Sequence, residues 1–231
     1  MYFKSMKFFS NTHIQSAALS ARLAYQCEQE HSDDTNSEVQ LNHMIFVINA
    51  IISSVSYLEA NINELFVECS ENKTGFKSNL RTNMINDSVI EALERSWKLG
   101  VPRTAKFSIL NKYDIALALA GIDSIDKSTS VYENADTLIK LRNSLVHYEP
   151  EWINDYLSDS ELTNKMAKRL KGKFDLNPLT GEGNPFYPDK CLSHGCAEWA
   201  VKTSLEYVDN FSSMFGFIPR HSNVDSHLGT R

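Results

Sequence analysis

Three residues in one short segment have side chains suited to chemistry on a phosphodiester. They are Arg142, Asn143 and His147, in a chain of 231 residues. A guanidinium group neutralises phosphoryl charge, and an imidazole accepts and donates protons near neutral pH. Cleavage by such a group requires no metal ion. We therefore predict a site in which Arg142, Asn143 and His147 are the catalytic residues.

The spacing of these residues places them at the end of a helix. Ala135 and Leu138 belong to an apolar stripe that Arg142 continues, and a guanidinium facing a core is costly unless it is paired. Asn143 and His147 are four residues apart and share a face. His147 lies in the last turn, where the helix dipole favours imidazolium. Arg142 and His147 point about 140° apart on a straight helix, so a second subunit could complete the site.

A structural role for the same residues is the alternative. In that case Arg142 forms a buried salt bridge to a carboxylate such as Glu59 or Glu64, and His147 only caps the helix end. This alternative is compatible with a helical module that has no catalytic activity. We assign Glu59 as a supporting residue, because it is better suited to pairing with Arg142 than to chemistry.

The elements that must position this group are helices. The longest predicted helix, over residues 38–70, would measure roughly 45–50 Å and form the centre of a bundle. No segment has the pattern of paired strands. Apolar periodicity predicts helices over residues 12–30, 38–70, 86–99, 104–119, 131–148, 161–170 and 193–215.

The fold class predicted from this pattern is all-α. We expect one helical domain over residues 1–218, with a core formed by about 38–150 and 191–217. A loop-rich insertion is expected over 151–190, because turn-breaking residues cluster before Pro188. Residues 219–231 are polar and are expected to form a flexible C-terminal tail. This tail contains a second arginine–histidine pair, Arg220 and His227, to which we assign no function.

Composition limits the kinds of partner. The chain is 42% hydrophobic with a net charge of −6, which excludes both a disordered chain and a wholly basic surface. Any contact with RNA must therefore come from a local patch. Such a patch contacts the RNA backbone, or it is simply a solvated helix face, and both interpretations stay open. Its candidate residues are Lys165, Lys168, Arg169, Lys171 and Lys173.

The remaining signals concern compartment and cofactors. The N-terminus does not have the pattern of a signal peptide, and the most apolar run, residues 44–55, is shorter than the roughly 20 residues a bilayer span needs. We expect a soluble, cytoplasmic protein without a membrane partner. Cys191, His194 and Cys196 have no evident fourth ligand and match no common zinc spacing. No metal and no other cofactor is predicted.

The segment Leu141-Arg-Asn-Ser-Leu-Val-His-Tyr148 resembles the motif of the HEPN superfamily. That motif is an arginine, four to six residues and a histidine, often with asparagine after the arginine and tyrosine after the histidine. The helices over residues 56–66 and 194–208 are also similar to the helices that flank this motif in the family. The resemblance covers roughly residues 38–215.

The resemblance implies an all-helical fold and a two-fold dimer in which two copies of the motif face each other. Many HEPN proteins are metal-independent endoribonucleases that act as toxins or phage-defence effectors. By resemblance, Arg142 would hold phosphate charge, His147 would act as acid or base, and Asn143 would orient the substrate or the histidine. The RNA 2′-hydroxyl would attack the adjacent phosphorus, leaving a cyclic phosphate and a 5′-hydroxyl.

The resemblance also names partners. RNA would be the substrate, a second copy of the chain would complete the site, and an antitoxin or a nucleotidyltransferase could be encoded as a separate chain. Tyr148 is a supporting residue that such a nucleotidyltransferase could modify. Other HEPN proteins have lost catalysis, so the alternative function is a non-catalytic module that binds another protein or a nucleotide.

Overall fold

A computed structural model describes residues 6–31, 37–71, 81–103, 107–147, 165–181 and 183–231. Over these ranges every regular element is helical and no strand is present, which confirms the all-α prediction. The elements are α1 (Ser10–Glu30), α2 (Ser37–Glu71), η2 (Thr82–Met84), α3 (Asp87–Lys98), α4 (Ile109–Leu119), α5 (Ser130–Val146), α6 (Lys165–Leu170), η4 (Phe186–Lys190), α7 (His194–Phe215) and η5 (Arg220–His227).

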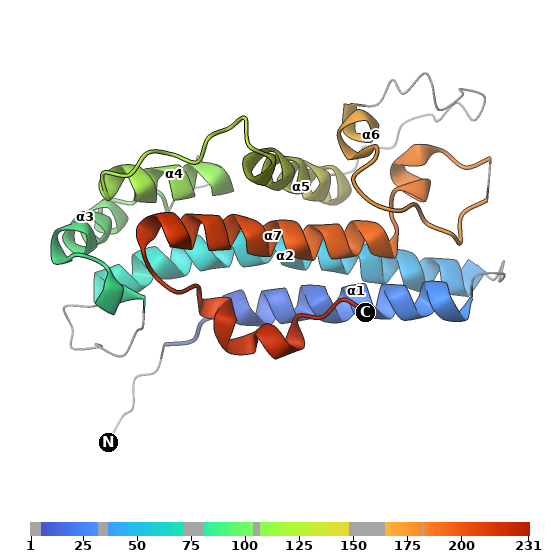
Figure 1. Cartoon of the computed structure of the whole chain (residues 1–231), viewed down its shortest axis with the longest axis horizontal. Helices are drawn as coiled ribbons and strands as arrows, with labels where there is room; N and C mark the ends of the chain where they lie inside the picture. The colour runs from blue at the N-terminus through green and yellow to red at the C-terminus, as the bar shows by residue number, and fades with distance from the viewer. Residues whose placement is uncertain (1–5, 32–36, 72–80, 104–106, 148–164, 182) are drawn as a thin grey trace.

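The bundle is organised around α2, the longest helix. Figure 1 shows α2 and α7 running side by side through the middle, with α1 along one side and α4 and α5 along the other. Ile51, Leu58 and Ile62 of α2 are fully buried between these neighbours. Burial of such side chains contributes roughly 1.5–3 kcal/mol each. The prediction of a long central helix is therefore confirmed, with bounds one residue wider at each end.

The core extends beyond the boundaries predicted for it, because α1 is part of it. Ala17, Ala21 and Ala24 of α1 are fully buried. Small side chains at steps of three and four allow one helix to approach another closely, and α1 lies against both α2 and α7. The weak apolar pattern of this segment did not indicate that it belongs to the core.

Residues 219–231 are an ordered part of the fold rather than a flexible tail. They form η5 and continue back along α1. The Tyr57 hydroxyl lies 2.7 Å from His221 Nδ1, and Arg22 Nη1 donates to the His227 carbonyl at 3.2 Å. His194 Nε2 lies 3.1 Å from the carbonyl oxygen of Thr230. Polar contacts to residues far away in sequence hold this segment, and apolar periodicity does not report such contacts.

A buried ion cluster joins α2 to the segment before η2. Arg81 donates from Nε to Glu68 Oε2 at 2.9 Å, from Nη2 to Glu68 Oε1 at 3.0 Å, and from Nη1 to Asn61 at 3.1 Å. The Arg81 and Glu68 side chains are 2% and 1% exposed. Arg220 of η5 also donates to Glu68, so the cluster attaches the C-terminal segment as well.

By length and composition α2 also meets the criteria for a membrane-spanning helix. Its most apolar stretch of 18 residues has a mean hydropathy of 1.5, and 50% of that stretch is buried inside the fold. The core helix of a globular bundle has the same properties. The other half of this stretch is not buried inside the fold.

Gly195 in the first turn of α7 lies against another segment of backbone. A Cβ at this position would lie 2.8 Å from the Asp175 carbonyl oxygen and 3.0 Å from its amide nitrogen. Gly195→Ala is expected to lower the free energy of unfolding by about 1–3 kcal/mol, as overpacking typically does. The matched control is Gly183→Ala, where a Cβ meets nothing within 4 Å. Urea denaturation of both variants measures the difference, and equal stability would contradict the contact.

Candidate active site at the end of α5

The candidate site lies on the last two turns of α5. The helix begins at the N-cap Thr129, whose side chain accepts the Tyr132 N–H, and it ends at the C-cap His147, whose N–H donates to the Asn143 carbonyl at 2.9 Å. Asn143 and His147 are exposed, whereas Arg142 is half-buried. The sequence placed Arg142 on the core-facing stripe, and the structure places it at the edge of that stripe, since the neighbouring Leu141 is the fully buried residue.

Arg142 forms no hydrogen bond or ion pair from its side chain to another described residue. Its Nε atom is buried and makes no hydrogen bond, and its guanidinium forms no ion pair within the part of the chain that the structure describes. An unpaired buried donor costs about 1–3 kcal/mol, so such groups are uncommon and require an explanation. A ligand that brings acceptor oxygens to this end of α5 would provide one.

The carboxylates expected to neutralise Arg142 are paired elsewhere. Glu59 accepts from Lys112 Nζ of α4 at 2.8 Å. Glu64 accepts from the Ser10 N–H at 2.8 Å and also from the Ser10 hydroxyl. The pair expected between Glu59 and Arg142 is not formed in the structure, where Glu59 instead pairs with Lys112, which is largely buried. The structure therefore contains no salt bridge from Arg142 to Glu59 or to Glu64.

Two residues that the sequence did not indicate stabilise this end of α5. The Tyr187 hydroxyl donates to Ser144 Oγ at 2.9 Å, and Ser144 Oγ donates to the Leu141 carbonyl at 2.8 Å. These bonds connect η4 to the turn that carries Arg142 and Asn143. Tyr187 lies among turn-breaking residues without periodicity, so no sequence signal connected it with the motif. Tyr148, the second supporting residue of the sequence prediction, lies outside the described residues.

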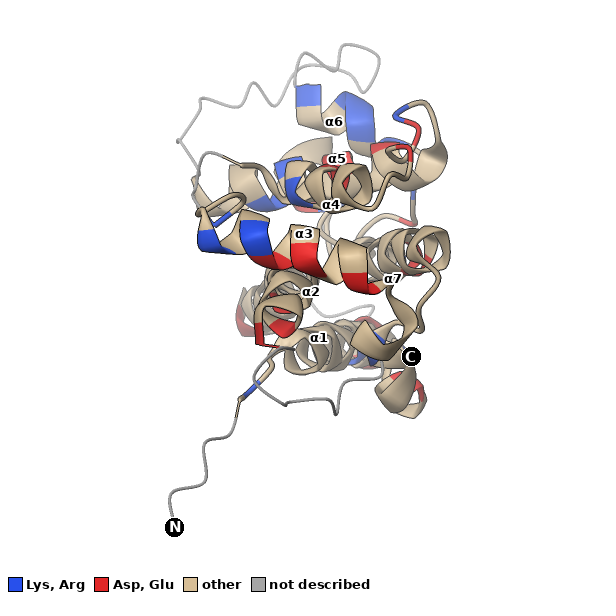
Figure 2. Cartoon of the chain, turned by 90° about the vertical axis from the view of Figure 1, so that its left-hand side faces the viewer, with Lys and Arg blue, Asp and Glu red and all other residues tan. Residues whose placement is uncertain are grey.

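The predicted RNA-binding residues lie on α6 and just after it, against α5. Arg169 Nη1 pairs with Asp136 of α5 at 3.1 Å, and Lys173 Nζ donates to Asn134 of α5 at 2.6 Å. Lys168 and Lys171 are exposed, as is Lys165 at the start of the helix. Figure 2 shows the lysine and arginine residues of α6 at the top of the molecule, next to α5. The structure thus brings the basic run to the helix that carries the motif.

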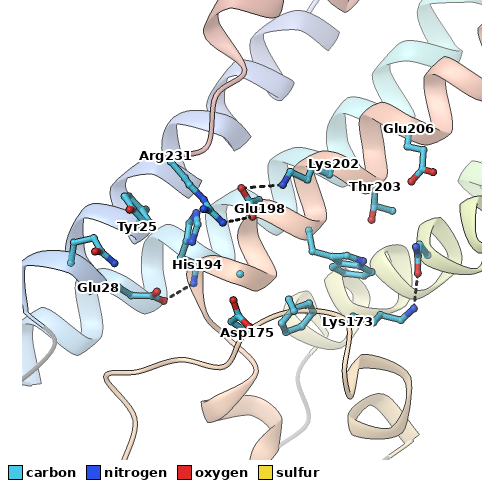
Figure 3. Close-up of a pocket in the computed structure, with 15 residues that line it drawn as sticks. Tyr25, Glu28, Lys173, Asp175, His194, Glu198, Lys202, Thr203, Glu206 and Arg231 are labelled. Carbon is cyan, nitrogen blue, oxygen red and sulfur yellow. Dashed lines mark hydrogen bonds and ion pairs between the residues drawn. The ribbon is translucent and has the colours of Figure 1, made fainter.

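A cavity of about 480 Å³ lies against α1 and α7 and is lined by several charged side chains. Figure 3 shows that several of its charged groups already pair with one another. Glu28 accepts the His194 N–H at 2.6 Å, and Glu198 pairs with Lys202 and Arg231, each at 3.2 Å. This internal pairing makes the cavity a weaker candidate for chemistry than the unpaired Arg142.

The side chains of Cys191, His194 and Cys196 are buried in the fold and are not arranged as metal ligands. Burial raises the pKa of Cys191 to about 12 and raises that of Cys196 well above the ordinary value of a thiol. A thiol held in its protonated form is a poor metal ligand. His194 is largely buried against the C-terminal segment. Among the described residues, no group of three or more His, Cys, Asp or Glu side chains is arranged to hold a metal ion.

The geometry at the end of α5 is thus one unpaired arginine beside two exposed polar side chains, with a basic helix docked on the same element. Phosphate oxygens are the acceptors that best match an arginine in this setting. Comparison with known proteins adds no family to this description: no family model, no characterised protein and no solved structure matches the chain.

Proposed function

We propose that this protein is a metal-independent endoribonuclease of the HEPN type, with Arg142 and His147 in its active site. The observation that carries the proposal is the Arg142 guanidinium, whose buried Nε has no hydrogen-bond partner among the described residues. A scissile phosphodiester supplies the acceptor oxygens that the described residues do not. The exposed Asn143 follows Arg142 directly, and the exposed His147 is the C-cap of the same helix, five residues further on.

The proposed reaction is an internal transfer at phosphorus. The RNA 2′-oxygen attacks the adjacent phosphorus and loses its proton to a base, while the bond to the 5′-oxygen breaks and that oxygen gains a proton. His147 serves as the proton carrier, and Arg142 stabilises the charge that develops on the phosphoryl oxygens. The products are a 2′,3′-cyclic phosphate and a 5′-hydroxyl. Because Arg142 and His147 diverge by about 140° around α5, the site is shared between two subunits.

The exposed lysines of α6 guide the RNA backbone toward α5 in this proposal. Replacing Lys168 and Lys171 with glutamate is expected to weaken RNA binding and to reduce its salt dependence. For single strands, each lost phosphate contact lowers the slope of log K against log salt by about 0.7. A salt series of fluorescence-anisotropy titrations measures both quantities. Lys7→Glu is the matched control, because Lys7 is exposed and precedes α1, which lies on the opposite side of the molecule from α6 (Figure 1). An equal effect of the control variant on RNA binding would show that the lysines of α6 do not form a specific RNA-binding surface.

The cellular role that we propose is that of a toxin or phage-defence effector acting on cytoplasmic RNA. An antitoxin or nucleotidyltransferase would then regulate the protein as a separate chain. If the purified dimer binds RNA, a nucleotide or a partner protein without cleaving RNA, the non-catalytic module replaces this proposal.

The reaction class is tested by the ends of the products. Purified protein in EDTA is incubated with end-labelled RNA, and the fragments are analysed for 2′,3′-cyclic phosphate and 5′-hydroxyl termini. We expect both termini, and we expect a 2′-deoxy substitution at the cleaved nucleotide to prevent cleavage there. Fragments with 5′-phosphate ends, or cleavage that survives the deoxy substitution, would exclude attack by the 2′-hydroxyl.

A further inference from the structure

The cavity that lies against α1 and α7 has the size of a small-molecule site. Its volume of about 480 Å³ falls within the range of roughly 300–1,000 Å³ that is typical of ligand pockets. Residues of α1, α5, α7 and the segment after α6 line it. Neither Arg142 nor His147 is among them, so the cavity is separate from the proposed active site.

The cations of this cavity already have acceptors. Lys202 and Arg231 each pair with Glu198 at 3.2 Å, and Lys173 donates to Asn134 at 2.6 Å (Figure 3). An anionic ligand would have to displace one of these contacts before a cation could bind it. Its gain would be small, because one hydrogen bond from a cation would only replace another.

The first turn of α7 also lines the cavity, and the protein itself satisfies part of it. Glu28 accepts the His194 N–H at 2.6 Å, and the Ser193 hydroxyl accepts the Cys196 N–H at 3.0 Å. A carboxylate thus already lies where the helix dipole would attract an anion. This arrangement disfavours an anionic ligand at the start of α7.

The charges that remain unmatched in the cavity are negative. Asp175 and Glu206 form no ion pair among the described residues, and both are exposed. The lining contains four carboxylates and three Lys or Arg side chains, so its formal net charge is −1 with neutral histidine. A carboxylate without a counter-ion is a good acceptor for an ammonium group. The charge that the cavity still lacks is therefore positive.

The aromatic side chains of the cavity favour the same kind of ligand. The Phe174 and Trp199 ring centroids lie 5.6 Å apart, and both residues are half-buried. Arg231 lies over the third ring, Tyr25, at 5.9 Å, whereas within the described ranges no Lys or Arg lies over Phe174 or Trp199. Aromatic faces attract ammonium groups and pack against hydrocarbon. An organic cation thus matches both the unpaired carboxylates and these two rings.

The spacing of the two carboxylates indicates an elongated ligand. A Cβ on Gly195 would lie 2.8 Å from the Asp175 carbonyl oxygen, so Asp175 lies beside the first turn of α7. Glu206 follows Gly195 by eleven residues on the same helix, which corresponds to about 16 Å along its axis. Trp199 lies between them, one turn beyond Gly195. Figure 3 shows Asp175 and Glu206 well apart, with Glu206 further along α7.

We propose that this cavity binds a linear polyamine. One terminal ammonium group pairs with Asp175 and the other with Glu206, and the chain between them lies along the Trp199 and Phe174 rings. The sign of the ligand follows from the pairing of the cations, and its length follows from the distance between the two carboxylates. No residue of the site on α5 takes part, so the inference does not depend on the proposed function.

Isothermal titration calorimetry of the full chain with spermine, without RNA, tests the proposal. We expect one site per chain and weaker binding at higher salt, because exposed charges are screened. Putrescine, a diamine too short to reach both carboxylates, is expected to bind more weakly than spermine. Magnesium chloride is the inorganic probe and is expected to bind more weakly still, because Mg²⁺ has no hydrocarbon to pack on the rings. No binding of spermine, or equal binding of all three probes, overturns the proposal.

Substitutions in the cavity locate the binding. Asp175→Asn and Glu206→Gln are each expected to lower the affinity for spermine about fivefold, the effect of losing one exposed ion pair, and to remove most of its advantage over putrescine. Trp199→Leu is expected to lower it about tenfold through the lost contact between cation and ring. The matched control is Asp123→Asn, an exposed acid outside the cavity, which is expected to bind spermine as the wild type does.

Circular dichroism melts establish that each variant is folded. If Trp199→Leu does not fold, the two carboxylate variants decide the question, because both of these side chains are exposed. Unchanged affinity in Asp175→Asn and Glu206→Gln, or an equal loss in Asp123→Asn, overturns the proposal. In the second case spermine is attracted by the acidic surface as a whole rather than by the cavity.

Discussion

Arg142→Ala is expected to lower RNA cleavage about 10²–10³-fold, the usual effect of removing one group that stabilises transition-state charge. The loss should fall mainly on kcat, because the guanidinium acts on charge that develops during the reaction. Arg142→Lys is expected to recover only part of the activity, since an ammonium group retains the charge but not the two parallel donors. Single-turnover cleavage of a labelled RNA measures each rate.

The same substitution should leave the fold intact. Replacing Arg142 with alanine breaks no ion pair among the described residues, because the guanidinium has no partner there. Its Nε is buried without a hydrogen bond. The free energy of unfolding is therefore expected to change by no more than about 1 kcal/mol. A loss of activity that merely follows a loss of stability would contradict the assignment of Arg142 to the site.

Mixing two inactive variants tests whether the site is shared. In a mixed dimer of Arg142→Ala and His147→Ala, one of the two composite sites retains both side chains. Refolding an equal mixture should therefore recover up to about one quarter of the wild-type activity. A mixture as inactive as its components, despite mixed dimers detected by mass spectrometry, would place both residues of each site on one subunit.

Arg81→Ala is expected to have the largest effect on stability. Arg81 makes three hydrogen bonds to Glu68 and Asn61 and is almost completely buried. Its removal leaves the Glu68 carboxylate in the core with less compensation, and breaking a buried pair in this way costs about 3–5 kcal/mol. Arg220 also contacts Glu68, so the C-terminal segment should loosen at the same time. Urea denaturation and hydrogen exchange of residues 219–231 measure the two effects.

Arg169→Ala is the control for this comparison. Arg169 pairs with Asp136 on the surface, where both side chains are substantially exposed. Exposed pairs contribute about 0–1 kcal/mol, so this variant should be nearly as stable as the wild type. If Arg81→Ala and Arg169→Ala lower the free energy of unfolding equally, the buried cluster does not stabilise the fold more than an exposed ion pair does.

The parts of this structure that could be predicted are those with a local signal. Ser193 and Asn86 are capping residues, and their side chains begin α7 and α3 where the sequence placed those helices. The long apolar stripe of α2 predicted the central helix for the same reason. The motif residues also came from local spacing, because Asn143 and His147 are separated by one helical turn.

What could not be predicted depends on contacts between distant segments. Glu59 pairs with Lys112 and not with Arg142, and the packing of α4 on α2 determines this pairing. Tyr187 reaches Ser144 from a segment without periodicity. The order of residues 219–231 depends on hydrogen bonds between segments far apart in the sequence, such as the contact of His221 with Tyr57, 164 positions away. Single-sequence patterns report which face of a helix is buried, but they do not report which partner buries it.

Cleavage of RNA in EDTA by the wild type and by His147→Ala tests most directly whether the end of α5 is an active site. Both proteins are first shown to be folded, and to be in the same oligomeric state. We expect the wild type to cleave and His147→Ala to be slower by about 10²–10⁴-fold, the range for loss of a general acid or base. Equal cleavage by the two proteins, or no cleavage by the wild type, would contradict the account.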